Sequence, residues 1–113
     1  MSAPLALTLG EPAGIGPDLT LAAWYRRAEF GLPPFYVLAE ADFLTELAER
    51  LRLPVRVTSV EPEAAAAAFA NALPVVSLGM KVTAQSGRPD ASSGPAAIAS
   101  IRRAMADVMA GRA

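Results

Sequence analysis

The chain has 113 residues, enough for one small domain or for part of a larger one. Hydrophobic residues make up 53% of the chain and charged residues 19%, a composition that excludes an intrinsically disordered protein. The 10 basic and 11 acidic residues give a net charge of −1, which provides no global field for binding nucleic acid. No apolar run approaches the roughly 20 residues that span a membrane, and the first residues lack the basic region of a signal peptide. We therefore expect a cytoplasmic protein without nucleic-acid or membrane partners.

The apolar content is high for a small free-standing domain, with a mean hydropathy of +0.34. A chain of this size leaves much of its surface exposed to water, so an apolar excess is hard to bury within it. This excess indicates a surface that another polypeptide covers. A second copy in a homodimer, or the rest of a longer chain, would provide that cover.

The most informative stretch is residues 5–18. Residues 5–9 are a short apolar run, typical of a strand buried on both faces of a parallel sheet. The next eight residues contain three glycines and two prolines, which specify a tight loop. Pro17 suits the first position of a helix, with Gly16 as its cap and Asp18 in its first turn. The pattern therefore predicts a strand, a tight loop and the start of a helix.

Two interpretations of this loop remain open. A helix start at the carboxyl edge of a sheet leaves free N–H groups, and α/β proteins bind anionic or nucleotide ligands there. Alternatively, the glycines and prolines only reverse the chain. The spacing of Gly10, Gly14 and Gly16 does not match G-x-G-x-x-G, and no phosphate-loop Gly-Lys-Ser/Thr is present.

Residues 19–30 are predicted to form the first helix. Its apolar side would hold Leu19, Ala22, Ala23 and Phe30, and Arg26, Arg27 and Glu29 would point outward. Trp24 and Tyr25 could form a shelf for a nucleobase, but packing in the core or at an interface is the interpretation we favour.

The remaining chain alternates between strand and helix patterns. Strands are predicted at residues 35–39, 55–60 and 73–78, and residues 80–83 could extend the last of them. The alternating pattern of 55–60 indicates a strand near an edge, with one face in water. Helices are predicted at 40–52, with a buried stripe of Leu44, Leu47, Ala48 and Leu51, and at the alanine-rich 61–68.

The last predicted helix covers residues 96–109 and follows a loop over 85–94. Ile98, Ile101, Met105 and Val108 form the apolar stripe of an amphipathic helix. Ser92 or Ser93 would cap its beginning, and Gly111 is a natural helix stop. The whole order of elements predicts an α/β fold, with a mainly parallel sheet, flanking helices and right-handed crossovers.

Few residues offer catalytic chemistry. The chain has no histidine and no cysteine, which excludes a disulfide framework, a thiolate metal site and a cysteine nucleophile. Lys81 is the only lysine, and a solvent-exposed role is favoured for it over a catalytic or phosphate-binding one. We therefore assign no catalytic residue and no metal ligand within these residues.

Residues 7–18 read Leu-Thr-Leu-Gly-Glu-Pro-Ala-Gly-Ile-Gly-Pro-Asp. This stretch resembles the amino-terminal signature Gly-Asp-Pro-Ala-Gly-Ile-Gly-Pro-Glu of the 4-hydroxythreonine-4-phosphate dehydrogenase family of pyridoxal phosphate (vitamin B6) biosynthesis. Glu11 replaces the usual aspartate and Asp18 the usual glutamate, so both positions keep their charge. The resemblance continues weakly through residues 86–90 and Gly94 to the end of the chain, whereas the family's sequences continue well beyond it.

The resemblance implies a fold like that of isocitrate and isopropylmalate dehydrogenases, with residues 1–113 as the amino-terminal α/β portion of a longer two-domain enzyme. It implies an NAD-dependent, homodimeric dehydrogenase that oxidises 4-phosphooxy-L-threonine, which then loses carbon dioxide, with a divalent metal polarising the reacting oxygen. By analogy with the isocitrate-type relatives, Gly14, Ile15 and Gly16 would border the adenine side of the NAD cleft. Glu11 would accept hydrogen bonds within its own loop or contact the ligand.

The family's active site is implied to hold its metal through histidines from two subunits, and this chain has none. We therefore expect a fragment that is inactive alone and binds neither NAD nor a divalent metal tightly. The alternative is a complete, non-catalytic α/β module that acts in oligomerisation or in binding small anions.

Overall fold

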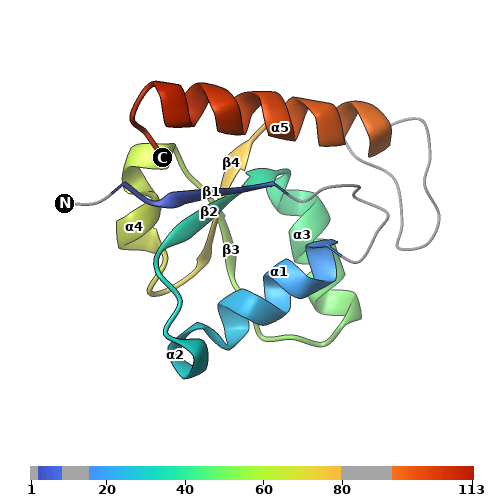
Figure 1. Ribbon diagram of the computed structural model, residues 1–113. Coiled ribbons are helices and arrows are strands. Elements are labelled where there is room, and N and C mark those ends of the chain that lie inside the picture. The colour runs from blue at the N-terminus through green and yellow to red at the C-terminus, as the bar shows by residue number, and fades with distance from the viewer. Residues whose placement is uncertain (1–2, 9–15, 80–92) are drawn as a thin grey trace.

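The structure is a computed structural model, and it describes residues 3–8, 16–79 and 93–113 (Figure 1). In chain order its elements are β1 (Leu5–Thr8), α1 (Gly16–Tyr25), α2 (Arg27–Phe30), β2 (Phe35–Ala39), α3 (Ala41–Arg50), β3 (Val57–Ser59), the 3-10 helix η1 (Pro62–Ala64), α4 (Ala65–Ala68), β4 (Leu73–Ser77) and α5 (Ser93–Met109). The possible strand at 80–83, Lys81 and most of the predicted loop over 85–94 lie outside the described residues.

The four strands form one parallel sheet in the order β1-β2-β4-β3. This arrangement confirms the predicted α/β fold with a parallel sheet. β2 is buried along its whole length because it lies between β1 and β4 and is covered on both faces. β3 is an edge strand with only partial burial, as its alternating sequence predicted.

The prediction that the first strand is buried on both faces is wrong. Leu5 of β1 is 58% exposed, and the other three residues of the strand are only half-buried. β1 pairs with β2 along one side, and no described strand pairs with its other side. An apolar run therefore predicts a strand, but it does not show whether the strand has a neighbouring strand on each side.

The two faces of β2 are covered by different helices (Figure 1). Phe35, Val37 and Ala39 belong to a core cluster that includes side chains of α1 and α3. Tyr36 and Leu38 point to the opposite face, where α4 and α5 pack. This alternation is the two-residue period of a strand, and it produces three layers, with helices on both sides of the sheet.

The predicted helix over 19–30 is interrupted, and its buried side is not the predicted one. A turn at Arg26 separates α1 from α2. Leu19 and Phe30 are 60% and 58% exposed, and the buried residues of α1 are Pro17, Thr20, Leu21 and Trp24. Burial of Trp24, the largest side chain in the helix, decides how α1 is rotated about its axis.

Trp24 lies in the core, which confirms the packing interpretation for this residue, whereas Tyr25 is 49% exposed. Its indole N–H donates a hydrogen bond of 2.9 Å to the carbonyl oxygen of Phe69. The Arg27 guanidinium lies 3.7 Å from the Trp24 ring centroid and donates to the Ala70 carbonyl. Arg27 therefore packs against the chain after α4 and does not point outward as predicted.

The predicted helix over 40–52 is shorter in the structure, and its buried side gains one residue and loses another. Leu44, Leu47 and Ala48 are buried as predicted, together with Phe43. Leu51, which directly follows α3, is 41% exposed and does not belong to the buried side. Residues 61–68 form η1 and α4 in place of one continuous helix.

Helix α5 contacts the sheet through its small and polar residues. Ala96, Ser100 and Asp107 are buried, and the Ser100 hydroxyl donates to the Leu38 carbonyl oxygen at 3.1 Å. The apolar stripe predicted for this helix faces water, with exposures of 51–62% for Ile98, Ile101, Met105 and Val108. Gly111, with a φ of 78°, follows the end of α5, as expected of a helix stop.

Asp107 is fully buried and connects three parts of the fold. Its carboxylate accepts hydrogen bonds from the Tyr36 hydroxyl at 2.5 Å, from Arg103 Nε at 2.8 Å and from Arg112 Nε at 2.9 Å. Burial alone would raise the pKa of Asp107, but these three donors together hold it below its ordinary value. Burial and the bond to Asp107 raise the pKa of Tyr36.

We predict that Leu44→Ala lowers the free energy of unfolding by about 3 kcal/mol, because it leaves a cavity in the larger core cluster. The Leu44 side chain is fully buried between α3 and the sheet. Thr45→Ala, at the exposed neighbouring position, is the matched control and should change stability by less than about 0.5 kcal/mol. Urea denaturation measures both values, and equal effects would contradict the described core.

We predict that Asp107→Asn destabilises the fold at pH 7 by on the order of 2 kcal/mol, since it leaves buried donors without their anion. The lowered pKa of Asp107 means that its contribution is complete above the unfolded value of about 3.9 and is lost as the pH falls through the folded value. The stability difference between wild type and Asp107→Asn should therefore shrink on acidification. Tyr36→Phe removes one donor and should give a smaller difference with the same direction.

Candidate functional site

The candidate site is the edge of the sheet where the strands end at their carboxyl termini. Because all four strands are parallel, these ends lie along the same edge. Open parallel sheets bind ligands outside this edge, in the crevice between the loops that follow the strands. In this chain the ends of β1, β2 and β4 lie at this edge. Glu40 directly follows β2, and Ser77 is the last residue of β4.

The Glu40 carboxylate links the end of β2 to the end of β4, the two central strands of the sheet. The Ser77 hydroxyl donates to both oxygens of Glu40, at 2.8 Å and 3.1 Å, and the Leu78 N–H donates to the same carboxylate at 2.9 Å. The Gly79 N–H in turn donates to the Ser77 hydroxyl at 3.1 Å. These bonds hold the backbone that leaves β4 against the residue that follows β2.

The sequence patterns did not single out Glu40 or Ser77. The patterns place Glu40 in the second predicted helix and Ser77 in the fourth predicted strand, and they predict no further role for either residue. The available signal was their position, since each ends or follows a buried strand of a parallel sheet. The pairing of the two became visible only with the strand order, in which β4 is the direct neighbour of β2.

Helix α1 begins next to this edge, at Gly16. Pro17 is buried in its first turn, and the Thr20 hydroxyl donates back to the Gly16 carbonyl at 2.9 Å. Gly16 was predicted as the cap and Pro17 as the first helical residue, so the helix begins one residue earlier than predicted. The acidic Asp18 lies in the first turn, where the positive end of the helix dipole favours a carboxylate.

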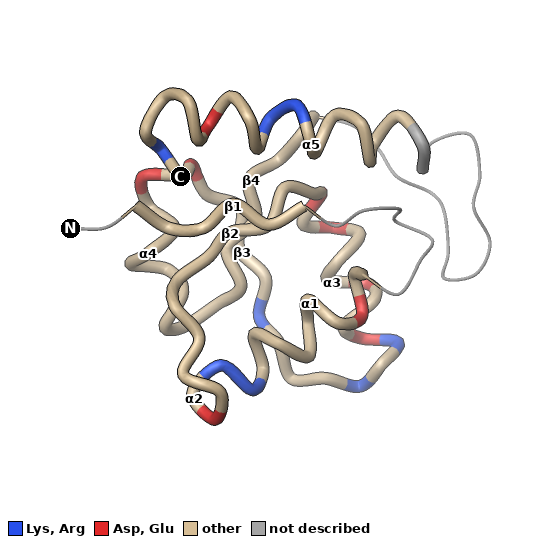
Figure 2. Tube along the Cα trace, in the orientation of Figure 1, with Lys and Arg blue, Asp and Glu red and all other residues tan. Residues whose placement is uncertain are grey.

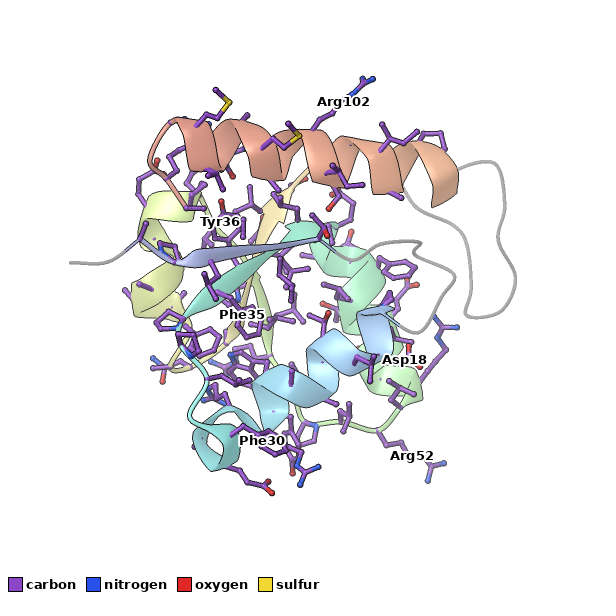
Figure 3. The ribbon with its side chains drawn as sticks, in the orientation of Figure 1. Asp18, Phe30, Phe35, Tyr36, Arg52 and Arg102 are labelled. Atoms are coloured by element: carbon purple, nitrogen blue, oxygen red, sulfur yellow. The ribbon has the colours of Figure 1, made fainter. Side chains whose placement is uncertain are left out.

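The Asp18 side chain leaves one polar atom without a partner. Its Oδ1 oxygen is buried and accepts no hydrogen bond from the residues that the structure describes, although the residue as a whole is only half-buried. Asp18 is labelled in Figure 3. Buried polar atoms of this kind are uncommon in folded proteins. Any donor that reached this oxygen would stabilise it.

Two of the three residues predicted to border a cofactor, Gly14 and Ile15, lie outside the described residues, as does Glu11. Gly16 is described as the first residue of α1. The cofactor assignment of Gly14, Ile15 and Gly16 stays a prediction. Within residues 3–8, 16–79 and 93–113, no group of three or more His, Cys, Asp or Glu side chains is placed to hold a metal ion.

The helices of the described part are also too short or too polar to cross a membrane. The longest, α5, carries three charged side chains, Arg102, Arg103 and Asp107, within its 17 residues (Figure 2).

The chain has close relatives among known proteins, although no family model matches it. A 4-hydroxythreonine-4-phosphate dehydrogenase of Bradyrhizobium diazoefficiens is 55% identical to it in an alignment of 118 positions. This alignment covers 97% of this chain and 34% of the relative. Proteins with the same name from Xanthobacter autotrophicus and Methylorubrum populi are 50% and 49% identical, and each is matched over 32% of its length. The chain thus spans about a third of these relatives.

Solved structures show the same fold. The crystal structure of a 4-hydroxythreonine-4-phosphate dehydrogenase from Burkholderia phymatum superimposes with a TM-score of 0.84 at 19% identity, covering 99% of this chain and 34% of that one. The dehydrogenase of that name from Klebsiella pneumoniae gives a TM-score of 0.76 at 25% identity, over 98% of this chain. In sequence and in fold, these 113 residues are therefore similar to about one third of proteins named 4-hydroxythreonine-4-phosphate dehydrogenase.

Proposed function

We propose that this chain is the amino-terminal, cofactor-binding portion of an NAD-dependent dehydrogenase of vitamin B6 biosynthesis. The whole protein would oxidise 4-phosphooxy-L-threonine, whose product then loses carbon dioxide. The observation that carries the proposal is the 55% identity, over 97% of this chain, with a relative of that name. The proposal includes a cytoplasmic location and a homodimeric whole protein.

The loop between β1 and α1 fits the role of a cofactor contact. β1 ends at the carboxyl edge of the parallel sheet, and α1 begins with Gly16 and Pro17. The first N–H groups of a helix have no partner within the helix and attract anionic groups such as phosphate. Gly14, Ile15 and Gly16 would then border the adenine side of the cofactor. When bound, NAD supplies the hydride acceptor for the alcohol oxidation.

The residues that the structure describes do not fit a divalent metal. The sequence has no histidine or cysteine, and the described part has no cluster of acidic ligands. We therefore assign no step of the reaction to a metal held by these residues. In the proposal, the metal ligands and the groups that hold the substrate phosphate belong to other parts of the protein.

The Glu40–Ser77 contact would support this function indirectly. It joins the ends of β2 and β4, which lie at the same edge of the sheet as the end of β1. A cofactor site needs its flanking loops held in one geometry, and hydrogen bonds behind the binding groups provide that rigidity. Glu40 and Ser77 are therefore positioning residues in this proposal, with no direct contact to a ligand assigned.

We predict that the 113-residue chain alone shows no NAD reduction with 4-phosphooxy-L-threonine and a divalent metal. A hybrid in which this chain replaces the matching third of the Bradyrhizobium diazoefficiens relative should show turnover, because 55% identity preserves the packing against the remainder. Absorbance at 340 nm follows the reaction. Turnover by the short chain, or a folded hybrid without turnover, would contradict the proposal and favour a non-catalytic module.

We predict that Ile15→Asp in this hybrid raises the KM for NAD about tenfold, equivalent to about 1.4 kcal/mol of lost binding. The added carboxylate would repel the cofactor phosphates and remove apolar contact with the adenine. Leu19→Asp is the matched control, since Leu19 is exposed on α1 only four residues further along. Equal effects of the two substitutions, or an effect confined to the KM for the phosphorylated substrate, would overturn the assignment of Ile15.

A further inference from the structure

The outer face of α5 is the largest concentration of exposed apolar side chains in the described part of the chain. Ile98, Ile101, Met105 and Val108 are each more than half exposed, and Met109 at the end of the helix is 86% exposed. Arg102, labelled in Figure 3, projects from the same outer side of the helix, away from the sheet. We call the first four residues the α5 stripe. Contiguous exposed apolar surface of this kind marks an interaction site.

Helix α5 cannot bury the α5 stripe by rotating about its axis. Its opposite side is held to the sheet by the bond from Ser100 to the Leu38 carbonyl and by the bond from Tyr36 to Asp107. Rotation would break both bonds and separate the Asp107 carboxylate from its Tyr36 donor, which is unfavourable. Cover for the α5 stripe must therefore come from outside the described part of the chain.

The spacing of the α5 stripe indicates that its cover is another helix. Its members are separated by three, four and three residues, which is the a/d pattern of a heptad repeat. Side chains in this pattern form a narrow seam that fits between the side chains of a facing helix at a shallow crossing angle. An a/d seam is narrower than the apolar face that a helix uses against a sheet.

We propose that the α5 stripe docks a helix from the two thirds of a family polypeptide that this chain does not match. The relatives are covered over only 32–34% of their length, while 97–98% of this chain is matched, so each relative contains a large additional portion. The α5 stripe spans only two heptads, whereas helices that pair through a heptad seam alone usually need three or four. A helix of the same polypeptide is present at high effective concentration and can pack on so short a seam. A second copy of this chain lacks that advantage.

This inference concerns a packing surface and goes beyond the proposed dehydrogenase activity. It uses the family relationship but no catalytic property. Its test therefore reads exposure and stability, so a hybrid without turnover would leave the test valid.

Cysteine labelling tests the proposal with little disturbance of the fold. Because the chain contains no cysteine, Ile101→Cys and Leu51→Cys each introduce one thiol at an exposed position of these 113 residues. We compare the short chain with the hybrid and follow each site by mass spectrometry with a maleimide. Cys at 101 should react at least about tenfold more slowly in the hybrid, where the docked helix would shield it. Cys at 51, on α3, is the matched control and should react equally in both proteins.

Thermal unfolding of glutamate variants provides a second measurement. Ile101→Glu and Met105→Glu should each lower the Tm of the hybrid by about 5 °C, because they place a charge in an apolar contact. In the short chain, where both positions face water, the same variants should shift the Tm by less than about 1 °C. Leu51→Glu is the control in both proteins.

Equal reactivity of the thiol at 101 in the short chain and the hybrid would overturn the proposal, since the α5 stripe would then be open in the longer protein. So would glutamate variants with equal effects in both. Light scattering tests the alternative that a second copy of this chain covers α5. If the short chain is a dimer, and Ile101→Glu or Met105→Glu converts it to a monomer, the partner of α5 is a second copy.

Discussion

The buried carboxylate of Asp107 determines how one whole side of this fold is arranged. It accepts hydrogen bonds from Tyr36 on the central strand β2, from Arg103 one helical turn earlier and from Arg112 beyond the helix end. A buried carboxylate is stable only when donors surround it, so these groups have to meet at one point. Their meeting orients α5 on the sheet, positions the chain beyond Gly111, and leaves the apolar residues of α5 on the outer side.

The opposite side of the sheet depends on ordinary apolar packing. Trp24 from α1 and Leu44 from α3 meet alternate residues of β2 in the larger core cluster. This packing brings the start of α1 to the carboxyl edge of the sheet, where Glu40 and Ser77 tie the two central strands together. The two faces thus have separate tasks in the fold. One supports the edge where a cofactor would bind, and the other presents a surface for further polypeptide.

Two features of the described residues are those of an incomplete protein surface. The outer side of β1 has no described partner strand, and the outer face of α5 carries a row of apolar side chains. Both agree with a chain that corresponds to about one third of its relatives. The backbone still superimposes on the Burkholderia phymatum structure with a TM-score of 0.84 at 19% identity. This agreement shows that the arrangement of layers tolerates extensive change in side chains.

Local sequence patterns were enough to predict the class of fold, the order of the elements and, through residues 7–18, the resemblance to a family. These follow from local patterns such as apolar runs, helical periods, glycines and prolines, which need no knowledge of distant contacts. Which side of each element is buried depends on tertiary contacts. A period reveals a stripe on a helix, but the face that meets the sheet depends on partners far along the chain, as Phe69 for Trp24 and Tyr36 for Asp107 show. The Glu40–Ser77 contact required the strand order for the same reason: it joins residues 37 positions apart that become neighbours only when β4 pairs with β2.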